Sequence, residues 1–135
     1  MKSSLAAGLA IVRELVVDRE RTIGFMGEAA RVYATPMMVR DIEMTCRELL
    51  LEHLDPGEDS VGTRVEIDHL AATLLGMTVK IEAKVTEVKG RAVMFEVSAH
   101  DGIDQCARCK HARFVVDLKK SEERLAAKAQ KAKAK

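Results

Sequence analysis

The pattern that decides the fold lies between Thr35 and Gly57 and reads TPMMVRDIEMTCRELLLEHLDPG. Thr is a preferred N-cap residue, and Pro suits the first helical position because its missing N–H would be unpaired there anyway. Four apolar residues then recur at helical spacing: Met38, Ile42, Cys46 and Leu49. At the other end, Asp55-Pro56-Gly57 combines a helix-breaking Pro with a turn Gly. The pattern predicts one long amphipathic helix, from Pro36 to about Leu54.

Outside this helix, apolar residues alternate with polar ones, which is typical of strands. Before the helix, Leu9 to Val17 predicts a strand, whereas residues 18–34 show too little periodicity for an assignment. After the helix, the alternation predicts about four long antiparallel strands, which pass through Val65 and Ile67, through Val79 to Val85, from Arg91 to His100 and from Gln105 to Leu118. Turns are predicted at Lys89-Gly90 and Asp101-Gly102.

This order of elements favours an α+β fold. A helix with a broad apolar face must bury that face, and the partner that this sequence offers is a curved antiparallel sheet. The sequence therefore predicts a hotdog fold, in which one long helix is wrapped by a curved antiparallel sheet. Such a sheet leaves open edges, so we expect a homodimer. The predicted domain covers residues 1–120, and residues 121–135 form a Lys- and Ala-rich C-terminal tail, either a fraying helix or a disordered segment.

The composition argues against several classes of partner. The chain has 135 residues, of which 22 are Lys or Arg, 21 are Asp or Glu, and 3% are aromatic. A nucleic-acid-binding domain is typically strongly basic and often carries aromatic stacking residues, so we expect no nucleic-acid partner. No apolar run reaches the roughly 20 residues of a membrane span, so we expect no membrane partner. Three cysteines cannot form a fully paired set of disulfides, which favours the reducing cytoplasm.

The sequence points to no metal and no cofactor. It contains no Gly-rich phosphate loop, no nucleophile elbow and no metalloprotease helix. Cys106 and Cys109 stand three residues apart in a predicted strand, so their thiols are expected on opposite faces and cannot chelate one ion together. No second Cys pair completes a tetrahedral site. Ordinary strand cysteines are the favoured interpretation.

Three polar residues are candidates for chemistry, and each also has a structural explanation. His69 is expected on the inward face of its strand, either as a proton-transfer group or as a hydrogen-bonded structural imidazole. Glu43 lies at the margin of the helix stripe, either at the edge of a pocket or on a solvated face where Arg40 and Arg47 flank it. Thr35 is explained as an N-cap, and its hydroxyl is a weak nucleophile unless a base activates it.

From about Thr22 to Leu118, the sequence resembles the fluoroacetyl-CoA thioesterase family of hotdog proteins. The resemblance rests on the order and spacing of these segments: Thr35 with Glu43, Leu54-Asp55-Pro56-Gly57-Glu58, Ser60-Val61-Gly62-Thr63, His69 with Ala71-Ala72-Thr73, Gly76-Met77-Thr78-Val79, Val97-Ser98-Ala99-His100-Asp101-Gly102-Ile103-Asp104, and His111 with Arg113. It implies that the catalytic residues are Thr35, Glu43 and His69, that Gly62 lies near the acyl group, and that Arg113 lies by the pocket. It also implies an acyl-CoA substrate, a homodimer and no metal.

The sequence departs from the family in the segment before Thr35. The family's lid there is longer and carries Phe, whereas the corresponding Ile23 to Ala34 is shorter and has Phe25 and Tyr33 as its aromatic residues. We expect these two side chains to contribute to substrate binding. The resemblance therefore implies thioester hydrolysis but not fluoroacetyl selectivity.

The leading hypothesis is hydrolysis of a short-chain acyl-CoA thioester by Thr35, Glu43 and His69. The thioester carbonyl is expected near the start of the long helix, where unpaired backbone N–H groups can stabilise the oxyanion. Glu43 would be the nucleophile or the general base, and the sequence does not separate these roles. The alternatives are a non-catalytic acyl-CoA-binding or regulatory hotdog module and, ranked lower for want of an Asp-His pattern, a hotdog hydratase.

Overall fold

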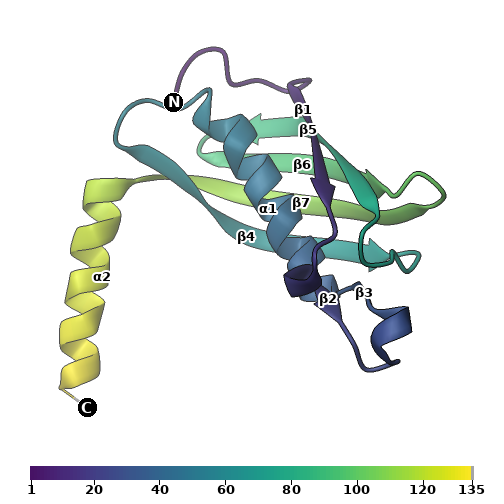
Figure 1. The fold of residues 1–135 in the computed structure, drawn as a ribbon. Helices are drawn as coiled ribbons and strands as arrows, with labels where there is room; N and C mark the ends of the chain where they lie inside the picture. The colour runs from purple at the N-terminus through teal and green to yellow at the C-terminus, as the bar shows by residue number, and fades with distance from the viewer. Residues whose placement is uncertain (135) are drawn as a thin grey trace.

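One α-helix lies across a face of a five-stranded antiparallel sheet (Figure 1). The structure is a computed structural model that describes residues 1–134. Its elements are, in order, β1 (Ala10–Val16), the 3-10 helix η1 (Arg19–Arg21), β2 (Thr22–Ile23), the 3-10 helix η2 (Glu28–Ala30), β3 (Val32–Tyr33), α1 (Thr35–Leu51), β4 (Glu58–His69), β5 (Thr78–Lys89), β6 (Ala92–His100), β7 (Gln105–Asp117) and α2 (Leu118–Lys133). The predicted α+β arrangement of one long helix and an antiparallel sheet is confirmed.

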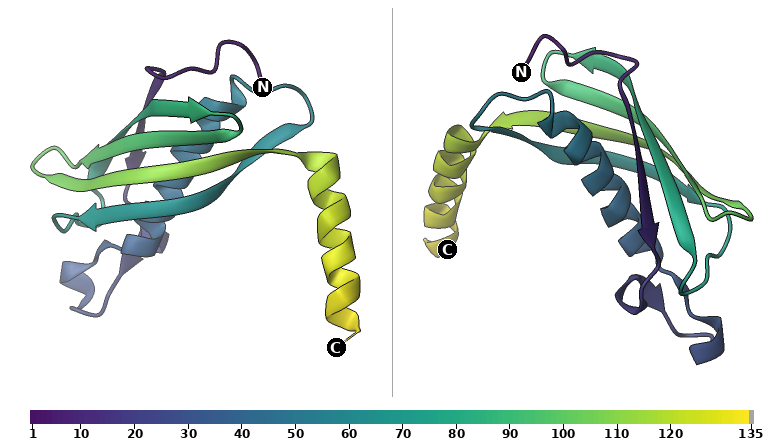
Figure 2. Two further views of the ribbon diagram at one scale, coloured as in Figure 1. Left: turned by 180° about the vertical axis from the view of Figure 1, so that it is seen from behind. Right: turned by 45° about the horizontal axis from the view of Figure 1, so that its top comes forward.

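The large sheet has the strand order β1-β5-β6-β7-β4, and every neighbouring pair is antiparallel. The sheet curves over one side of α1 (Figure 2). β1 and β4 are its two edges, so β4 bonds to β7 on one side and has no partner strand on the other among residues 1–134. The strand that directly follows α1 therefore presents a free edge.

The core lies between α1 and the inward face of the sheet. Met38, Ile42 and Cys46 are fully buried and Leu49 is nearly so, which confirms the predicted helix stripe. Alternate residues of β5 and β6 meet this stripe, and they are Val79, Ile81, Ala83, Val85, Val93, Phe95, Val97 and Ala99. Full burial of one large aliphatic side chain contributes about 1.5–3 kcal/mol, so this interface fixes where α1 lies.

Both ends of α1 differ from the prediction. The N-cap is Ala34 rather than Thr35, and no side chain caps the helix. Thr35 is the first helical residue, and its hydroxyl bonds to the His69 ring instead of to a backbone N–H of the helix. At the other end the helix stops at Leu51, not at Leu54, and irregular turns carry the chain to Asp55.

Residues 18–34 form a short substructure that sequence periodicity did not reveal. Here β2 and β3 pair as a small hairpin, with Thr22 opposite Tyr33, at the end of α1 where the helix begins (Figure 1). Tyr33 is buried, and its backbone N–H donates to the carbonyl of Thr73 at 2.8 Å. Two-residue strands are too short to show a period in the sequence.

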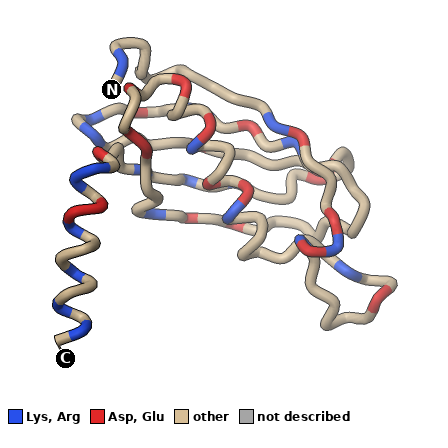
Figure 3. The backbone as a smooth tube through the Cα atoms, turned by 60° about the vertical axis from the view of Figure 1, so that its left-hand side comes forward, with Lys and Arg blue, Asp and Glu red and all other residues tan. Residues whose placement is uncertain are grey.

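The C-terminal segment is a helix that projects away from the sheet (Figures 1 and 2). Asp117 caps it, because its side chain accepts from the backbone N–H of Lys120 at 3.0 Å. Basic residues follow its length with one acidic stretch near its start, and both charge signs are also interspersed over the sheet (Figure 3). Of the tail predicted at residues 121–135, residues 121–133 are thus part of a capped helix that starts at Leu118. The last residue, Lys135, lies outside the described residues.

Candidate active site

Thr35 and His69 come together at the N-terminal end of α1. Thr35 Oγ1 and His69 Nδ1 lie 2.7 Å apart, within hydrogen-bonding distance. Thr35 is exposed in the first turn of the helix, and His69 is half-buried at the end of β4 on the same side as Val65 and Ile67. The His69 side chain therefore points inward, as the sequence predicted. A hydroxyl against an imidazole nitrogen is the arrangement that activates hydroxyl groups in acyl transfer.

The surroundings of His69 favour a neutral imidazole. Burial lowers the pKa of His69 below its ordinary value of 6.5, and an interaction with the Ala71 backbone offsets part of this effect. A neutral ring can accept a proton at Nδ1, whereas a protonated ring cannot. His69 is thus suited to draw a proton from the Thr35 hydroxyl or to hold that hydroxyl in a fixed orientation.

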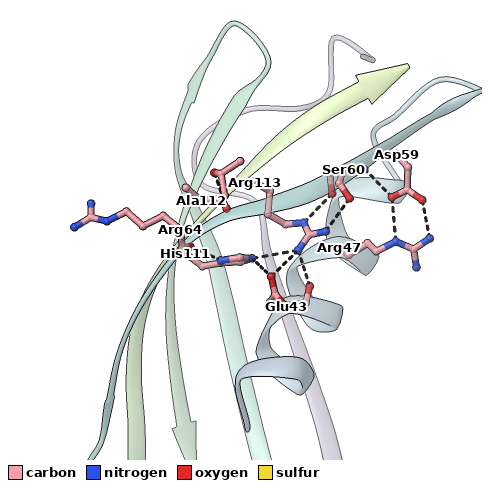
Figure 4. Close-up of polar contacts among 9 residues, drawn as sticks. Glu43, Arg47, Asp59, Ser60, Arg64, His111, Ala112 and Arg113 are labelled. Atoms are coloured by element: carbon pink, nitrogen blue, oxygen red, sulfur yellow. Dashed lines mark hydrogen bonds and ion pairs between the residues drawn. The ribbon is translucent and has the colours of Figure 1, made fainter. Parts of the chain in front are cut away.

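Glu43 belongs to a second cluster, farther along α1 (Figure 4). Its Oε1 lies 3.7 Å from Arg113 Nη1 and 3.9 Å from His111 Nε2, and its side chain is 32% exposed. A Cβ built on Gly62 would overlap Glu43 Oε1. The carboxylate therefore lies against the bare backbone of β4, with a cation and an imidazole from β7 beside it and solvent on its open side.

Arg113 is held firmly although it is buried. Its Nε donates to Ser60 Oγ at 2.7 Å and its Nη2 donates to the Ser60 carbonyl at 2.8 Å. The Arg113 side chain is 3% exposed, and burial lowers its pKa, yet guanidinium groups stay protonated in proteins. Glu43 thus faces a fixed positive charge.

The interpretation of Glu43 as a solvated ion-pair residue between Arg40 and Arg47 does not describe the structure. Arg47 instead forms a bidentate pair with Asp59, with bonds of 3.0 and 2.7 Å. These bonds hold the pKa of Asp59 below its ordinary value. Within residues 1–134, the cation that pairs with Glu43 is Arg113, which comes from the sheet.

The two clusters do not meet within one protomer. Thr35 and Glu43 are eight residues apart on α1, which corresponds to about 12 Å along the helix axis. Thr35 and His69 lie at one end of that span, and Glu43, Gly62 and Arg113 lie at the other. The structure therefore brings two of the three candidate catalytic residues together and leaves the third apart.

The start of α1 offers fewer free amides than the sequence implied. The backbone N–H groups of Met37 and Met38 both donate to the Ala34 carbonyl at 3.0 Å, and Pro36 has no N–H. Among residues 1–134, the Thr35 amide is the one in the first turn without an acceptor. Of the groups expected to stabilise the oxyanion, the Thr35 amide and the positive end of the helix dipole therefore remain.

The two aromatic residues of the segment before α1 occupy different environments. Phe25 is 75% exposed in the loop after β2. Tyr33 is buried, and its hydroxyl donates to Asp41 at 2.5 Å, where Arg21 also donates through Nε and Nη2. Tyr33 therefore supports the first turns of α1 from the core rather than presenting an exposed surface, and direct substrate contact stays a prediction for Phe25.

Asp41 ties the β2–β3 segment to α1, so its loss is expected to weaken the fold. Asp41→Asn removes the charge that Arg21 pairs with and weakens the acceptor of Tyr33, at a site that is 2% exposed. We expect the free energy of unfolding to fall by about 1–3 kcal/mol, measured by urea denaturation. Asp55→Asn, at a half-exposed position, is the control and should change it much less. Equal stability of Asp41→Asn and wild type would contradict the structural role.

The cysteine thiols and the metal-binding side chains outside these two clusters offer no second reactive site within the described residues. Burial raises the pKa of the Cys46 thiol to about 12 and that of Cys109 to about 11. No group of three or more His, Cys, Asp or Glu side chains within residues 1–134 is arranged to hold a metal ion. None of the helices in this part of the chain is long and apolar enough to cross a membrane.

Comparison of this sequence with those of known proteins identifies its family. The sequence profile of the fluoroacetyl-CoA-specific thioesterases matches residues 17–119. This chain belongs to that family. The fluoroacetyl-CoA thioesterase of Streptantibioticus cattleyicolor is 35% identical over 127 residues, which cover 89% of this chain and 91% of that protein.

Solved structures agree with the fold. A Thermus thermophilus member of the thioesterase superfamily is 29% identical with a TM-score of 0.89, over 98% of this chain and 99% of that one. A hot-dog-like protein from Thermanaerovibrio acidaminovorans is 25% identical with a TM-score of 0.83, over 90% of this chain and 91% of that one. The predicted hotdog fold is confirmed, and the chain is a thioesterase by family.

Proposed function

We propose that this thioesterase hydrolyses a short-chain acyl-CoA by the combined action of Thr35, His69 and Glu43. The observation that carries the proposal is the 2.7 Å contact between the Thr35 hydroxyl and the His69 imidazole at the start of α1. An N-cap Thr would have bonded to its own helix. A hydroxyl aimed at an imidazole has instead the geometry of proton transfer.

The proposal includes a homodimer with two active sites, each of which is shared by both protomers. β4 is a free edge that carries both Gly62 and His69, seven residues apart. If two copies of β4 pair antiparallel about a two-fold axis near Val65 and Glu66, residue 62 of one copy lies beside residue 69 of the other. The Glu43 cluster of one protomer would then face the Thr35–His69 pair of its partner.

In such a site each residue has a distinct task. The thioester carbonyl would lie at the start of α1, where the Thr35 amide can donate to the developing oxyanion while the Thr35 hydroxyl stays bonded to His69. Glu43 would either attack the carbonyl carbon and displace the CoA thiolate to form a mixed anhydride, which water then hydrolyses, or take a proton from the water molecule that attacks this carbon. His69 would take up the proton that is released in the attack by water and pass it to the sulfur of the departing CoA thiolate.

The direct test is a panel of acyl-CoA substrates of increasing chain length, from acetyl- and fluoroacetyl-CoA to hexanoyl-CoA, with release of the CoA thiol as the readout. We expect turnover with a preference for the short acyl groups. Tight binding of the panel by calorimetry without thiol release would instead support the non-catalytic acyl-CoA-binding module. Assays of the same acyl groups attached to an acyl-carrier protein would show whether the enzyme uses CoA or the carrier protein.

Gly62 is expected to be required for the position of Glu43. In Gly62→Ala the new Cβ would overlap Glu43 Oε1 and lie 3.3 Å from His111 Cε1, so the carboxylate must move. Displacement of a reacting group by about 1 Å can cost about 10²-fold, and we expect kcat/KM to fall to that extent. Gly90→Ala, in the β5–β6 turn at φ +59°, strains the backbone without contact to Glu43, so it is the control for lost stability and should keep its activity. Activity of Gly62→Ala equal to wild type would show that Glu43 acts from a different position.

The pH dependence should report the neutral His69. Because burial lowers its pKa below 6.5, His69 stays neutral as the pH falls through 6.5 and protonates only in more acidic solution. If the neutral ring is the active form, kcat/KM should stay level on lowering the pH to about 6.5 and decline below it. An NMR titration of the His69 ring gives its pKa independently. A His69 pKa above 6.5 would contradict this assignment.

A further inference from the structure

His111 is a buried imidazole in contact with the Glu43 cluster, and the proposed mechanism gives it no task. It lies on β7 with 0% exposure and stacks on Phe95, with ring centroids 6.2 Å apart. Its Nδ1 lies 2.7 Å from the Arg64 carbonyl oxygen, and its Nε2 lies 3.2 Å from Arg113 Nη1. Both ring nitrogens therefore have partners, one from β4 and one from β7.

These partners determine which nitrogen carries the proton. A carbonyl oxygen only accepts, so Nδ1 must be the donor towards Arg64. Arg113 only donates, so Nε2 must keep its lone pair. Burial, aided by the nearby Arg113 charge, lowers the pKa of His111 below 6.5, which agrees with a neutral ring. His111 is thus a neutral imidazole that accepts a bond from Arg113.

The bond to His111 gives the Arg113 guanidinium a further anchor, besides its two bonds to Ser60. Ser60 accepts from Nε and Nη2 on one side, whereas His111 accepts from Nη1 on the side that faces Glu43 (Figure 4). The same Nη1 lies 3.7 Å from Glu43 Oε1. Without an acceptor at His111, Nη1 would keep only its 3.5 Å bond to the Glu43 carbonyl, and the guanidinium would be anchored mainly through its two bonds to Ser60. The planar group could then tilt as a whole and shift Nη1 relative to Glu43 Oε1.

We propose that His111 is a positioning residue, which orients Arg113 through Nε2 and thereby holds the Glu43 carboxylate against Gly62 in its reactive position. This inference rests on the proposed function, since it assigns to His111 a task in supporting Glu43. His111 does not touch the substrate. It acts through Arg113. A side chain of the same size cannot replace it unless that side chain has an acceptor at the position of Nε2.

Two substitutions separate this task from simple packing. His111→Asn keeps a donor for the Arg64 carbonyl and loses the acceptor for Arg113, whereas His111→Gln places an amide oxygen near the position of Nε2. Each variant keeps one of the two contacts, so similar urea midpoints are expected. We expect kcat of His111→Asn to fall by about 10-fold or more with little change in KM, and kcat of His111→Gln to stay within about threefold of wild type.

A double-mutant cycle with Glu43→Gln then tests the route of the effect. If His111 acts through Glu43, adding His111→Asn to Glu43→Gln should lower the residual rate by less than about twofold. Equal kcat losses in His111→Asn and His111→Gln, or a full multiplicative loss in the double variant, would overturn the inference while leaving the proposed function intact. Wild-type activity in Glu43→Gln would instead overturn the proposed function.

A measurement on the unaltered protein covers the case in which either variant fails to fold. Long-range proton–nitrogen NMR spectra of histidine rings distinguish the two neutral tautomers and the protonated form. We expect His111 at neutral pH to carry its proton on Nδ1 alone. A proton on Nε2 would make the imidazole a donor towards Arg113, and that result would overturn the inference without any substitution.

Discussion

Glu43→Gln is expected to lower kcat for acyl-CoA hydrolysis by about 10²–10⁴-fold, the range that a positioned general base contributes. The amide keeps the shape of the side chain and an oxygen towards Arg113, but it neither accepts a proton from water nor attacks a thioester. Because the lost interaction belongs to the transition state, KM should change little. Thiol release in the steady state measures both constants.

Glu48→Gln is the matched control for this substitution. Glu48 lies on the same helix, is half-exposed and has a long 3.7 Å pair with Arg13. The Glu48→Gln variant should retain wild-type activity. If Glu43→Gln were as active as Glu48→Gln, the carboxylate would have no part in the reaction. The Glu43–Arg113 pair would then be structural.

Much of the fold could be predicted because the relevant patterns are local. The stripe from Met38 to Leu49 repeats at helical spacing, and the four strands after it alternate with period two. The β2–β3 hairpin was missed because two-residue strands carry no such period. Its position depends instead on Asp41 and Tyr33, whose contact joins separate elements.

The candidate site was predictable in its residues but not in its grouping. The family resemblance pointed to Thr35, Glu43 and His69, and the alternation of β4 placed His69 on the inward face. Sequence does not show that Thr35 leaves the N-cap to Ala34 and bonds to His69, because local propensity favours the cap. Nor does it show that Glu43 lies about 12 Å farther along the helix from that pair, among side chains of the sheet.

The burial of His111 and Arg113, on which their proposed roles rest, had a signal in the sequence. Along β7, period two places Cys109, His111 and Arg113 on the face that also carries Val115. A cation and an imidazole on an inward strand face require buried partners. Those partners, Ser60 and the Arg64 carbonyl, lie on β4, some fifty residues away in sequence, and they become visible only in three dimensions.

The second large effect concerns the sharing of the site between protomers. In the proposed dimer, a heterodimer of a Thr35→Ala protomer and a Glu43→Gln protomer would have one composite site with both substitutions and one composite site with neither. It should therefore show about half of the wild-type activity, although each parent homodimer is nearly inactive. Two different affinity tags and tandem purification give this heterodimer free of both parents.

The reciprocal heterodimer provides the control with the same two substitutions. A Thr35→Ala/Glu43→Gln protomer paired with a wild-type protomer leaves one substitution in each composite site, so it should be nearly inactive. Sites confined to single protomers predict the reverse, because the wild-type protomer would then keep a complete site. Both heterodimers have the same composition, so differences in stability between them are small.

The comparison of these two heterodimers tests the shared Thr35, His69 and Glu43 site most directly. We predict about half of wild-type activity when the substitutions lie on different protomers, and less than about a tenth of it when they lie on the same protomer. Activity in the second heterodimer and not in the first would contradict the account.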